Sequence, residues 1–155
     1  MDRTVVAYCG LYCDACCFRV AVRDLDGRHF MNLPEKYVWA KDMALDAEPP
    51  CPGCKAEDSQ CSECKIRNCA KEKGLTNCSQ CDSFPCGLIA DFCGDSIPHH
   101  GAVIGNLMRL GQVGEDAWLE EQRAMWICGC GKALSWYMKK CPDCAAEQKE
   151  EGGTA

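Results

Sequence analysis

The sequence predicts a small α-rich or irregular domain with short helices, stabilised by metal ions at thiolate knuckles, followed by a C-terminal module of short antiparallel strands. Seventeen of the 155 residues are cysteine, more than the roughly 8–10% that marks a disulfide scaffold or a metal-loaded protein. Most of these cysteines stand in close pairs. The apolar residues come in short, scattered groups, which suggests that metal ions replace a conventional core in residues 5–93.

Two features favour metal ligands over disulfides. The odd cysteine total of 17 prevents complete pairing, and close cysteine pairs in a reducing compartment are usually metal ligands or redox groups. Thr4–Tyr8 lack the apolar core of about 7–15 residues that a signal peptide has. Because no apolar run reaches the roughly 18 residues of a membrane span, we expect a cytoplasmic protein without a membrane partner.

The first cysteine block has the spacing Cys9-x3-Cys13-x2-Cys16. Radical S-adenosylmethionine enzymes hold a 4Fe–4S cluster with this spacing, but they place an aromatic residue where this chain has Ala15. They also need a large α/β barrel, which a chain of this length cannot build. Three interpretations stay open: a further zinc site, an iron–sulfur cluster, or free reactive thiols. Candidates for the fourth ligand of such a zinc site are Cys86 and Cys93.

The segment that follows has mixed helical patterning in Phe18–Val22 and Tyr37–Leu45. Asp24–Gly27 reads as a turn, and Glu48–Pro50 breaks the chain before the second cysteine block.

The second block contains a local duplication. Two copies of Cys-x2-Cys-x4-Cys are offset by 17 residues and follow a separate Cys-x2-Cys pair. The cysteines involved are Cys51 and Cys54, then Cys61, Cys64 and Cys69, then Cys78, Cys81 and Cys86. Eight thiolates are enough for two closed four-ligand sites. One scheme joins Cys51 and Cys54 to Cys64 and Cys69, and another cross-links the two repeats.

Each repeat is expected to form a knuckle followed by a short helix. Ile66–Lys73 has helical composition, and Gly74 stands where a left-handed C-terminal cap belongs. In the second copy Ser83 can cap a helix that has Pro85 in its first turn and continues through Cys86–Phe92.

A helical connector precedes the third block. Ala102–Leu110 places apolar residues on one face, and Gly111 can end that helix. Gly114–Trp126 starts a second helix with acidic residues in its first turn, where they complement the helix dipole.

The third block supplies Cys128-Gly-Cys130 and Cys141-Pro-Asp-Cys144. Such knuckles bring two sulfurs to one metal while the backbone N–H groups of the tight turn point at them, and zinc takes four such ligands. The pattern looks like a zinc ribbon, with short strands at Trp126–Ile127 and Leu134–Tyr137. Its first knuckle is one residue shorter than the usual ribbon pattern.

The remaining residues offer no catalytic constellation. His29 is expected at the surface, and His99-His100 at a solvated helix start, with a metal pair as the alternative. A cysteine nucleophile needs a specific base, and nothing singles out one cysteine. The sequence therefore favours a protein that is not an enzyme.

Several stretches together resemble the prokaryotic domain-of-unknown-function family 3795. They are Tyr8-Cys-Gly-Leu-Tyr-Cys13, Cys51-Pro-Gly-Cys54, Cys64-Lys-Ile-Arg-Asn-Cys69-Ala-Lys-Glu-Lys-Gly74 and Asn77-Cys-Ser-Gln-Cys81-Asp-Ser-Phe-Pro-Cys86. The resemblance covers roughly residues 5–93, and the connector and ribbon look like a C-terminal extension. It implies a cysteine-rich, metal-binding cytosolic protein of bacteria or archaea, and it implies no activity.

The expected organisation has four parts: a cysteine-rich metal-binding domain at 1–97, a two-helix connector at 98–126, a zinc ribbon at 127–146 and a flexible tail at 147–155. The leading interpretation is a structural or interaction module with three or more zinc ions and a protein partner. The alternatives are an iron–sulfur or thiol redox protein, and zinc-thiolate transfer chemistry. A net charge of −6 argues against a nucleic-acid partner.

Overall fold

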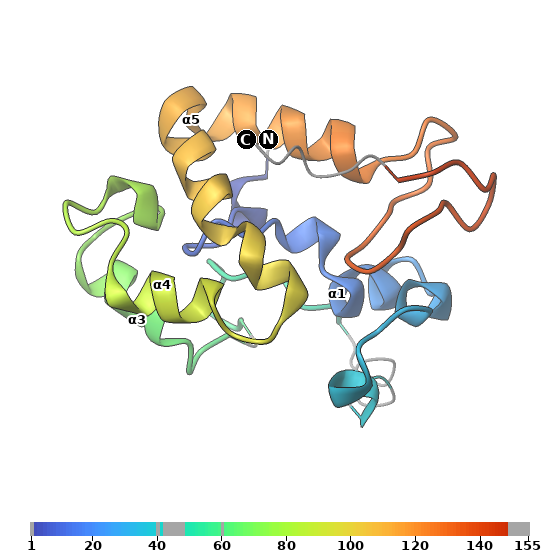
Figure 1. Ribbon diagram of the computed structural model, residues 1–155, viewed down its shortest axis with the longest axis horizontal. Coiled ribbons are helices and arrows are strands. Elements are labelled where there is room, and N and C mark those ends of the chain that lie inside the picture. The colour runs from blue at the N-terminus through green and yellow to red at the C-terminus, as the bar shows by residue number, and fades with distance from the viewer. Residues whose placement is uncertain (1, 40, 42–48, 60, 149–155) are drawn as a thin grey trace. The chain divides into compact units, whose positions relative to one another are not determined.

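The computed structural model describes residues 2–39, 41, 49–59 and 61–148. Within these residues the structure is mostly helical, with short helices and no β-sheet (Figure 1). The α-helices are α1 (Cys17–Arg23), α3 (Lys65–Glu72), α4 (Gly87–Cys93) and α5 (Val103–Trp126). Six 3-10 turns complete the order: η1 (Arg3–Val5), η2 (Cys13–Ala15), η3 (Gly27–Phe30), η4 (Glu35–Tyr37), η5 (Cys78–Gln80) and η6 (Pro98–Ala102).

The chain divides into two compact units. Of the described residues, unit 1 contains 2–13, 52–59 and 61–120, and unit 2 contains 14–39, 41, 49–51 and 121–148. The predicted segmentation at 97/98, 126/127 and 146/147 stays a prediction. No helix in the described part of the chain is long and apolar enough to cross a membrane.

Unit 1 has an apolar core around its N-terminal loop. Residues 5–12 are all buried, and the loop is closed by an antiparallel bridge between Val6 and Tyr12. The ring of Tyr12 meets Trp118 edge to face, with centroids 6.1 Å apart. A Cβ on Gly10 would lie 2.7 Å from Cγ of the fully buried Leu107. Metals in this unit would therefore supplement a hydrophobic core, and the expectation that they replace one is wrong.

Helix α3 ends as its sequence predicts. Gly74 adopts φ 66°, and the N–H groups of Gly74 and Leu75 donate to the carbonyls of Lys71 and Ala70 at 3.0 Å each. This pair of hydrogen bonds is a Schellman motif, in which a left-handed residue lets the chain reverse while the last helical carbonyls stay satisfied.

Helix α4, which contacts α3, begins later than expected because Cys86, and not Ser83, is its N-cap. The hydroxyl and N–H of Ser83 are used elsewhere, since both donate to the sulfur of Cys81. The N–H of Phe84 donates to the Cys81 carbonyl at 2.9 Å, so residues 81–84 form a turn.

The break in the connector also lies later than predicted. The helix continues past Gly111 and is interrupted at Gly114, which has φ 79° and ψ 166°. A Cβ on Gly111 would lie 3.4 Å from the Cβ of Ser79, so Gly111 allows a close approach of two segments and does not stop the helix. The second helix of the connector starts at Gly114, as expected.

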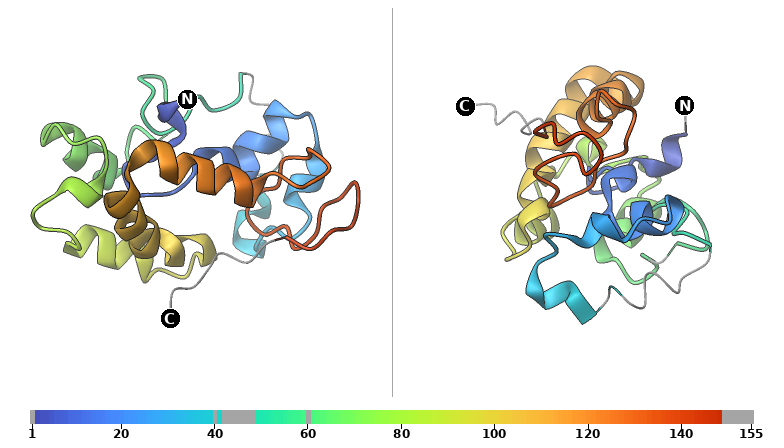
Figure 2. Two further views of the ribbon diagram at one scale, coloured as in Figure 1. Left: turned by 90° about the horizontal axis from the view of Figure 1, so that it is seen from above. Right: turned by 90° about the vertical axis from the view of Figure 1, so that its right-hand side faces the viewer.

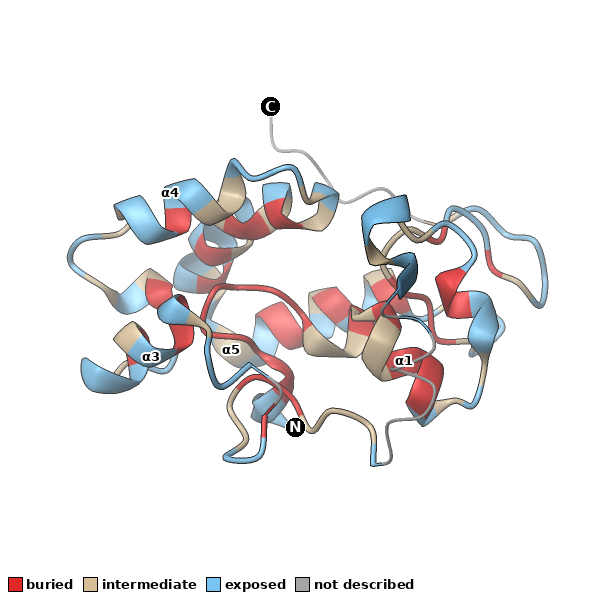
Figure 3. Cartoon of the chain, turned by 90° about the horizontal axis from the view of Figure 1, so that it is seen from below, coloured by how far each residue is buried: buried red, intermediate tan, exposed pale blue. Residues whose placement is uncertain are grey.

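Unit 2 is built on α1, which confirms the helix predicted at Phe18–Val22. Its buried face is visible in Figure 3. The side chains of Cys17 and Ala21 pack with Phe30 of η3, and Tyr137 lies against this cluster. Tyr37 ends η4. Residues 40 and 42–45 of the predicted segment Tyr37–Leu45 lie outside the described residues, as do Glu48 of the predicted chain break and residues 149–155 of the expected tail.

Two of the three histidines are buried, which the sequence did not predict. His29 is 1% exposed, its Nδ1 lies 2.9 Å from Ser135 Oγ, and its Nε2 has no hydrogen-bond partner among the described residues. Burial lowers the pKa of His29, so the ring is neutral near pH 7. His100 stacks on Phe92 at 3.7 Å and hydrogen-bonds Asp95 at 2.8 Å.

Candidate metal centre

The four C-terminal cysteines lie on two loops of similar construction that follow α5 (Figure 2). An antiparallel bridge closes each loop, between Ile127 and Ala133 in the first and between Lys140 and Glu147 in the second. Within these closures the N–H of Cys128 donates to Lys132 O at 2.9 Å, and the N–H of Cys141 donates to Ala146 O at 2.8 Å. The two cysteine pairs are thus held by equivalent backbone hydrogen bonds.

The strands predicted for a ribbon are absent from this described region, and the isolated bridges stand in their place. The reason lies in the backbone of 134–137. The N–H of Leu134 donates to Trp126 O at 2.8 Å, but the N–H of Trp136 donates to Ala15 O at 2.8 Å. Tyr137 has φ 72°, outside the extended region. A pair of strands needs continuous cross-strand hydrogen bonding, which this turn interrupts.

The residue after the second cysteine is left-handed in both loops. Gly131 has φ 90° and Ala145 has φ 59°. This conformation turns the chain back after the cysteine pair, so that N–H groups face the sulfurs. Glycine adopts it without strain, whereas a residue with a Cβ does so at a cost.

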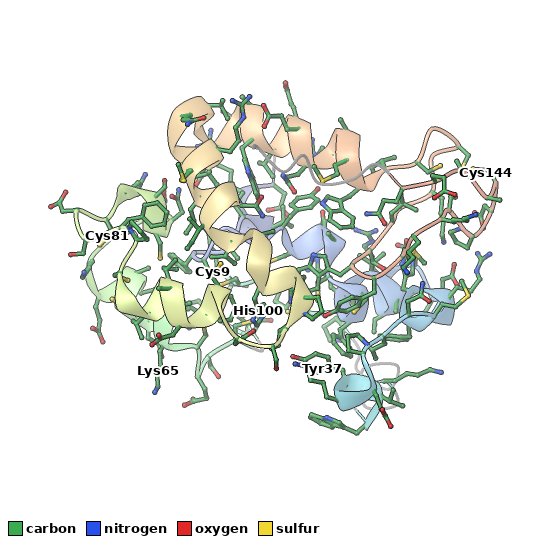
Figure 4. The ribbon with its side chains drawn as sticks, viewed as in Figure 1. Cys9, Tyr37, Lys65, Cys81, His100 and Cys144 are labelled. Atoms are coloured by element: carbon green, nitrogen blue, oxygen red, sulfur yellow. The ribbon has the colours of Figure 1, made fainter. Side chains whose placement is uncertain are left out.

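The four sulfurs converge. The Sγ atoms of Cys128 and Cys144 are 3.5 Å apart, those of Cys130 and Cys141 are 3.6 Å apart, and all four lie within 4.8 Å of one another. Four sulfurs at about 2.3 Å from a central zinc would be about 3.8 Å apart, whereas a disulfide requires about 2.05 Å. All seventeen cysteines are described, and none forms a disulfide. Figure 4 shows Cys144 in the second loop.

Backbone N–H groups point at these sulfurs. Lys132 donates to Cys130, Ala146 to Cys144, and both Asp143 and Cys144 to Cys141. Although desolvation opposes the shift, the N–H groups lower the pKa of Cys141 to about 7. Four thiols this close cannot all ionise alone, because each negative sulfur repels the others. A divalent cation removes that repulsion, so the donor set fits a thiolate-bound metal.

Within unit 2, η3 and its N-cap Asp26 contact the two loops. Lys132 Nζ lies 2.7 Å from Asp26 Oδ2, and Arg28 pairs with Asp143 at 2.9 Å. Asp26 also accepts from Arg28, and the pKa of its carboxyl lies well below the usual range because of Arg28 and Lys132. The His29–Ser135 hydrogen bond adds a buried polar contact.

A second group of cysteines lies in unit 1 near the buried N-terminal loop. The thiol of Cys54 donates to Cys61, which lowers the pKa of Cys61 to about 6 with help from Ser59 and Arg67. Arg67, only 5% exposed, donates to the carbonyl of Cys54 at 2.8 Å. The N–H of Tyr8 donates to the Cys54 sulfur. Further cysteines that interact electrostatically within this group are Cys9, Cys13 and Cys64.

A third group surrounds a pocket at α3 and α4 in unit 1. Cys69, Cys78, Cys81 and Cys86 all line it. The scheme that joins Cys51 and Cys54 to Cys64 and Cys69 stays a prediction. In the structure the Cys54 thiol donates to Cys61, and Cys69 lines a pocket together with the three cysteines of the second repeat.

The first cysteine block is divided between the two units. Cys9 and Cys13 belong to unit 1, and Cys16 and Cys51 belong to unit 2. Within unit 2, burial raises the pKa of Cys16 to about 12, and Cys17 and Cys51 are close enough to add to the shift. The Arg19 guanidinium donates to the Cys51 carbonyl.

The sequence analysis did not predict two buried residues near the cysteine clusters, Arg67 in unit 1 and His29 in unit 2. Arg67 places a buried cation beside Cys61, and its only sequence signal is its position inside the Ile-Arg-Asn-Cys stretch. His29 carries no sequence signal at all, because its neighbours are charged and its burial depends on Ser135, 106 positions away.

Comparison with known proteins agrees with the N-terminal part of this picture. No curated protein and no solved structure matches the chain. A family model described as "Protein of unknown function (DUF3795)" matches residues 5–91, more than half of the chain. That stretch contains all the cysteines of the first two blocks except Cys93, and the cluster at 128–144 lies beyond it. The chain is thus a cysteine-rich member of the DUF3795 family.

Proposed function

We propose that this chain is a zinc-binding protein whose ions are structural, and that it presents a metal-stabilised surface to a protein partner. The observation that carries the proposal is the convergence of Cys128, Cys130, Cys141 and Cys144, whose sulfurs lie within 4.8 Å of one another. Thiolates are soft ligands that select zinc or iron, and a tetrahedral four-sulfur set is typical of structural zinc.

The closed ligand set argues for a structural role. Catalytic zinc has three protein ligands and an open position, whereas here four thiolates would fill all four positions of a tetrahedral zinc. The loops 127–148 contain no strand or helix in their described residues. A structural zinc site supplies on the order of 10–16 kcal/mol of apparent binding free energy, comparable to the roughly 5–15 kcal/mol stability of a whole domain. The ion would therefore decide whether these loops are ordered.

The cysteine groups of unit 1 support two or more further zinc sites in the same protein. Each four-thiolate zinc site carries a net charge of about −2, which would add to the net −6 of the chain. A strongly negative protein repels phosphate backbones, so the expected partner is a protein.

The test is elemental analysis of the full chain purified anaerobically without added metal, followed by chelation under reducing conditions. We expect colourless protein with zinc, and amide NMR signals of residues 127–148 that lose dispersion when the zinc is removed. Signals that keep their positions in the zinc-free chain would contradict a structural role. Iron with visible thiolate-to-iron absorption would instead favour the alternative interpretation, an iron–sulfur cluster at Cys9-x3-Cys13-x2-Cys16.

The interaction role needs its own comparison. Proteins retained by the zinc-loaded chain are compared with those retained by the Cys128→Ser/Cys141→Ser variant. Retention of a specific protein by the zinc-loaded chain alone would support the proposal, and identical sets would contradict it.

A further inference from the structure

The pocket at α3 and α4 brings together cysteines from both sequence repeats. Cys69 lies in the last turns of α3, Cys78 begins η5, Cys81 follows η5, and Cys86 caps α4. All four line the same pocket. Figure 4 shows Cys81 in the loop between the two helices.

The backbone explains why these four residues line one pocket, although their sulfurs are not gathered within 4.8 Å of one another as those of the C-terminal set are. The Schellman turn at Gly74 reverses the chain after α3, so that the following segment returns past Cys69. Asn77 then caps η5 by accepting from the N–H of Ser79 at 3.1 Å. The turn between Cys81 and Phe84 carries the chain to the start of α4. The pair Cys78–Cys81 forms the knuckle, and the helices supply one cysteine each.

The negative charges of four thiolates in this pocket need a cation to balance them. Four thiolates on the wall of one pocket repel one another, and a divalent cation removes that repulsion. The one nearby basic side chain among the described residues that line the pocket is Lys73, whose Nζ lies 3.4 Å from Cys81 Sγ. Lys73 is exposed and carries one charge, too little for four thiolates.

The rest of the wall is apolar. The pocket is otherwise lined by hydrophobic side chains, including Ile66, Ala70, Phe84 and Ile89. Apart from Lys73, these side chains offer no oxygen or nitrogen ligand that would compete with the thiolates for a cation, and their low polarity strengthens the attraction between thiolates and a bound cation. Soft sulfur ligands exclude magnesium and calcium, which prefer oxygen.

We propose that Cys69, Cys78, Cys81 and Cys86 bind a single zinc ion in unit 1. This deepens the proposed function, on which it rests, by assigning four ligands to one of its sites. The assignment makes the two repeats unequal: the second gives all three of its cysteines, and the first gives only Cys69. Cys64 lies within electrostatic range of Cys78 but does not line the pocket, and Cys61 is engaged by Cys54.

The test measures zinc per chain by native mass spectrometry of the full protein under reducing conditions. The variant Cys78→Ser/Cys86→Ser should lose one zinc relative to the unmodified chain. Cys93→Ser is the matched control and should keep every ion. The sequence left Cys93 open as a ligand of the first cysteine block, but in the structure it ends α4 outside the pocket, with its Sγ 3.5 Å from Gly101 O. Cys128→Ser/Cys141→Ser should also lose one zinc, and the variant that combines all four substitutions should lose two, which shows that the two pairs belong to different sites.

A second measurement tests the same assignment without the double variant, in case that variant does not fold. The unmodified zinc-loaded chain is labelled with N-ethylmaleimide, and each cysteine is read by peptide mass spectrometry. The four pocket cysteines should be protected at least tenfold relative to Cys93, and chelation should remove the protection.

The outcomes separate the two proposals. If the unmodified chain holds no zinc, the proposed function fails and this assignment fails with it. If the chain holds zinc but the double variant keeps all of it, or the pocket cysteines react as fast as Cys93 while zinc is bound, the assignment alone is overturned. Iron that is lost with the double variant would overturn the choice of zinc.

Discussion

The two C-terminal loops allow one backbone conformation to be tested in opposite directions. Gly131 and Ala145 occupy the same position in their loops, after the second cysteine, with φ 90° and 59°. Replacing Gly131 with alanine introduces a Cβ into the left-handed region, and replacing Ala145 with glycine removes one. Nothing lies within 4 Å of a Cβ on Gly131, so the substitution creates no clash and reports on the backbone alone.

The magnitude follows from the cost of that conformation. A left-handed residue with a Cβ costs about 1–2 kcal/mol, and alanine recovers about 0.4–1 kcal/mol by restricting the unfolded chain. We therefore expect Gly131→Ala to lower the stability of the loaded loops by about 1 kcal/mol and Ala145→Gly to raise it by a similar or smaller amount. Because metal binding and loop folding are linked, about 1 kcal/mol corresponds to a roughly fivefold change in apparent zinc affinity.

The assay is competition with a chromophoric chelator at pH 7 under reducing conditions, read on the full chain. Gly129→Ala is the control, because Gly129 lies in the same loop without a positive φ and with nothing within 4 Å of its Cβ position. Gly131→Ala should weaken retention of one zinc, Ala145→Gly should strengthen it, and the control should stay within twofold. Shifts of the same sign in the first two variants would refute the reasoning, since it rests on their equivalent positions.

Other predictions concern packing, charge and thiol reactivity. Gly10→Ala should lower the free energy of unfolding by about 2–4 kcal/mol in urea titrations, because the strain of φ 84° adds to overpacking against the fully buried Leu107. Gly105→Ala is the control: it has open space around it in α5 and should raise the free energy of unfolding by about 0.5–1 kcal/mol. Asp26→Asn should lower the free energy of unfolding by about 1 kcal/mol at pH 7, where the carboxylate pairs with Arg28 and Lys132. Because the pKa of Asp26 is lowered in the folded state, this stabilisation is present above the ordinary carboxyl pKa and is lost in acid. The control Asp91→Asn, at an exposed position, should leave the free energy of unfolding unchanged. In the zinc-free chain, alkylation of Cys61 should reach half its maximal rate at about pH 6, and a midpoint near the pKa of an ordinary thiol, about 8.5, would contradict the assigned hydrogen bonds.

The short-range features of the fold could be predicted from the sequence. The helix at Lys65–Glu72 and its glycine cap follow from local propensity and from the rarity of left-handed residues other than glycine. The same holds for α1 and for the start of the second connector helix at Gly114. The candidate metal set at 128–144 follows from spacing, because two close cysteine pairs joined by a short loop leave few other arrangements.

The features that were missed depend on partners distant in sequence. The predicted ribbon strands do not form, because the N–H of Trp136 donates to the carbonyl of Ala15, more than a hundred residues away in the sequence. Ser83 does not cap α4, because residues 81–84 form a turn around the sulfur of Cys81 and the helix begins only at Gly87. His29 is buried through its contact with Ser135. The grouping of the cysteines in unit 1 likewise depends on how α3 and α4 pack, which spacing alone does not determine.

The most direct test of the account is anomalous X-ray scattering at the zinc edge, from crystals of the full chain grown under reducing conditions without added metal. We expect an anomalous peak between Cys128, Cys130, Cys141 and Cys144, at about 2.3 Å from each sulfur. Ordered loops with no peak between these sulfurs, or sulfurs joined as disulfides at about 2.05 Å, would contradict it.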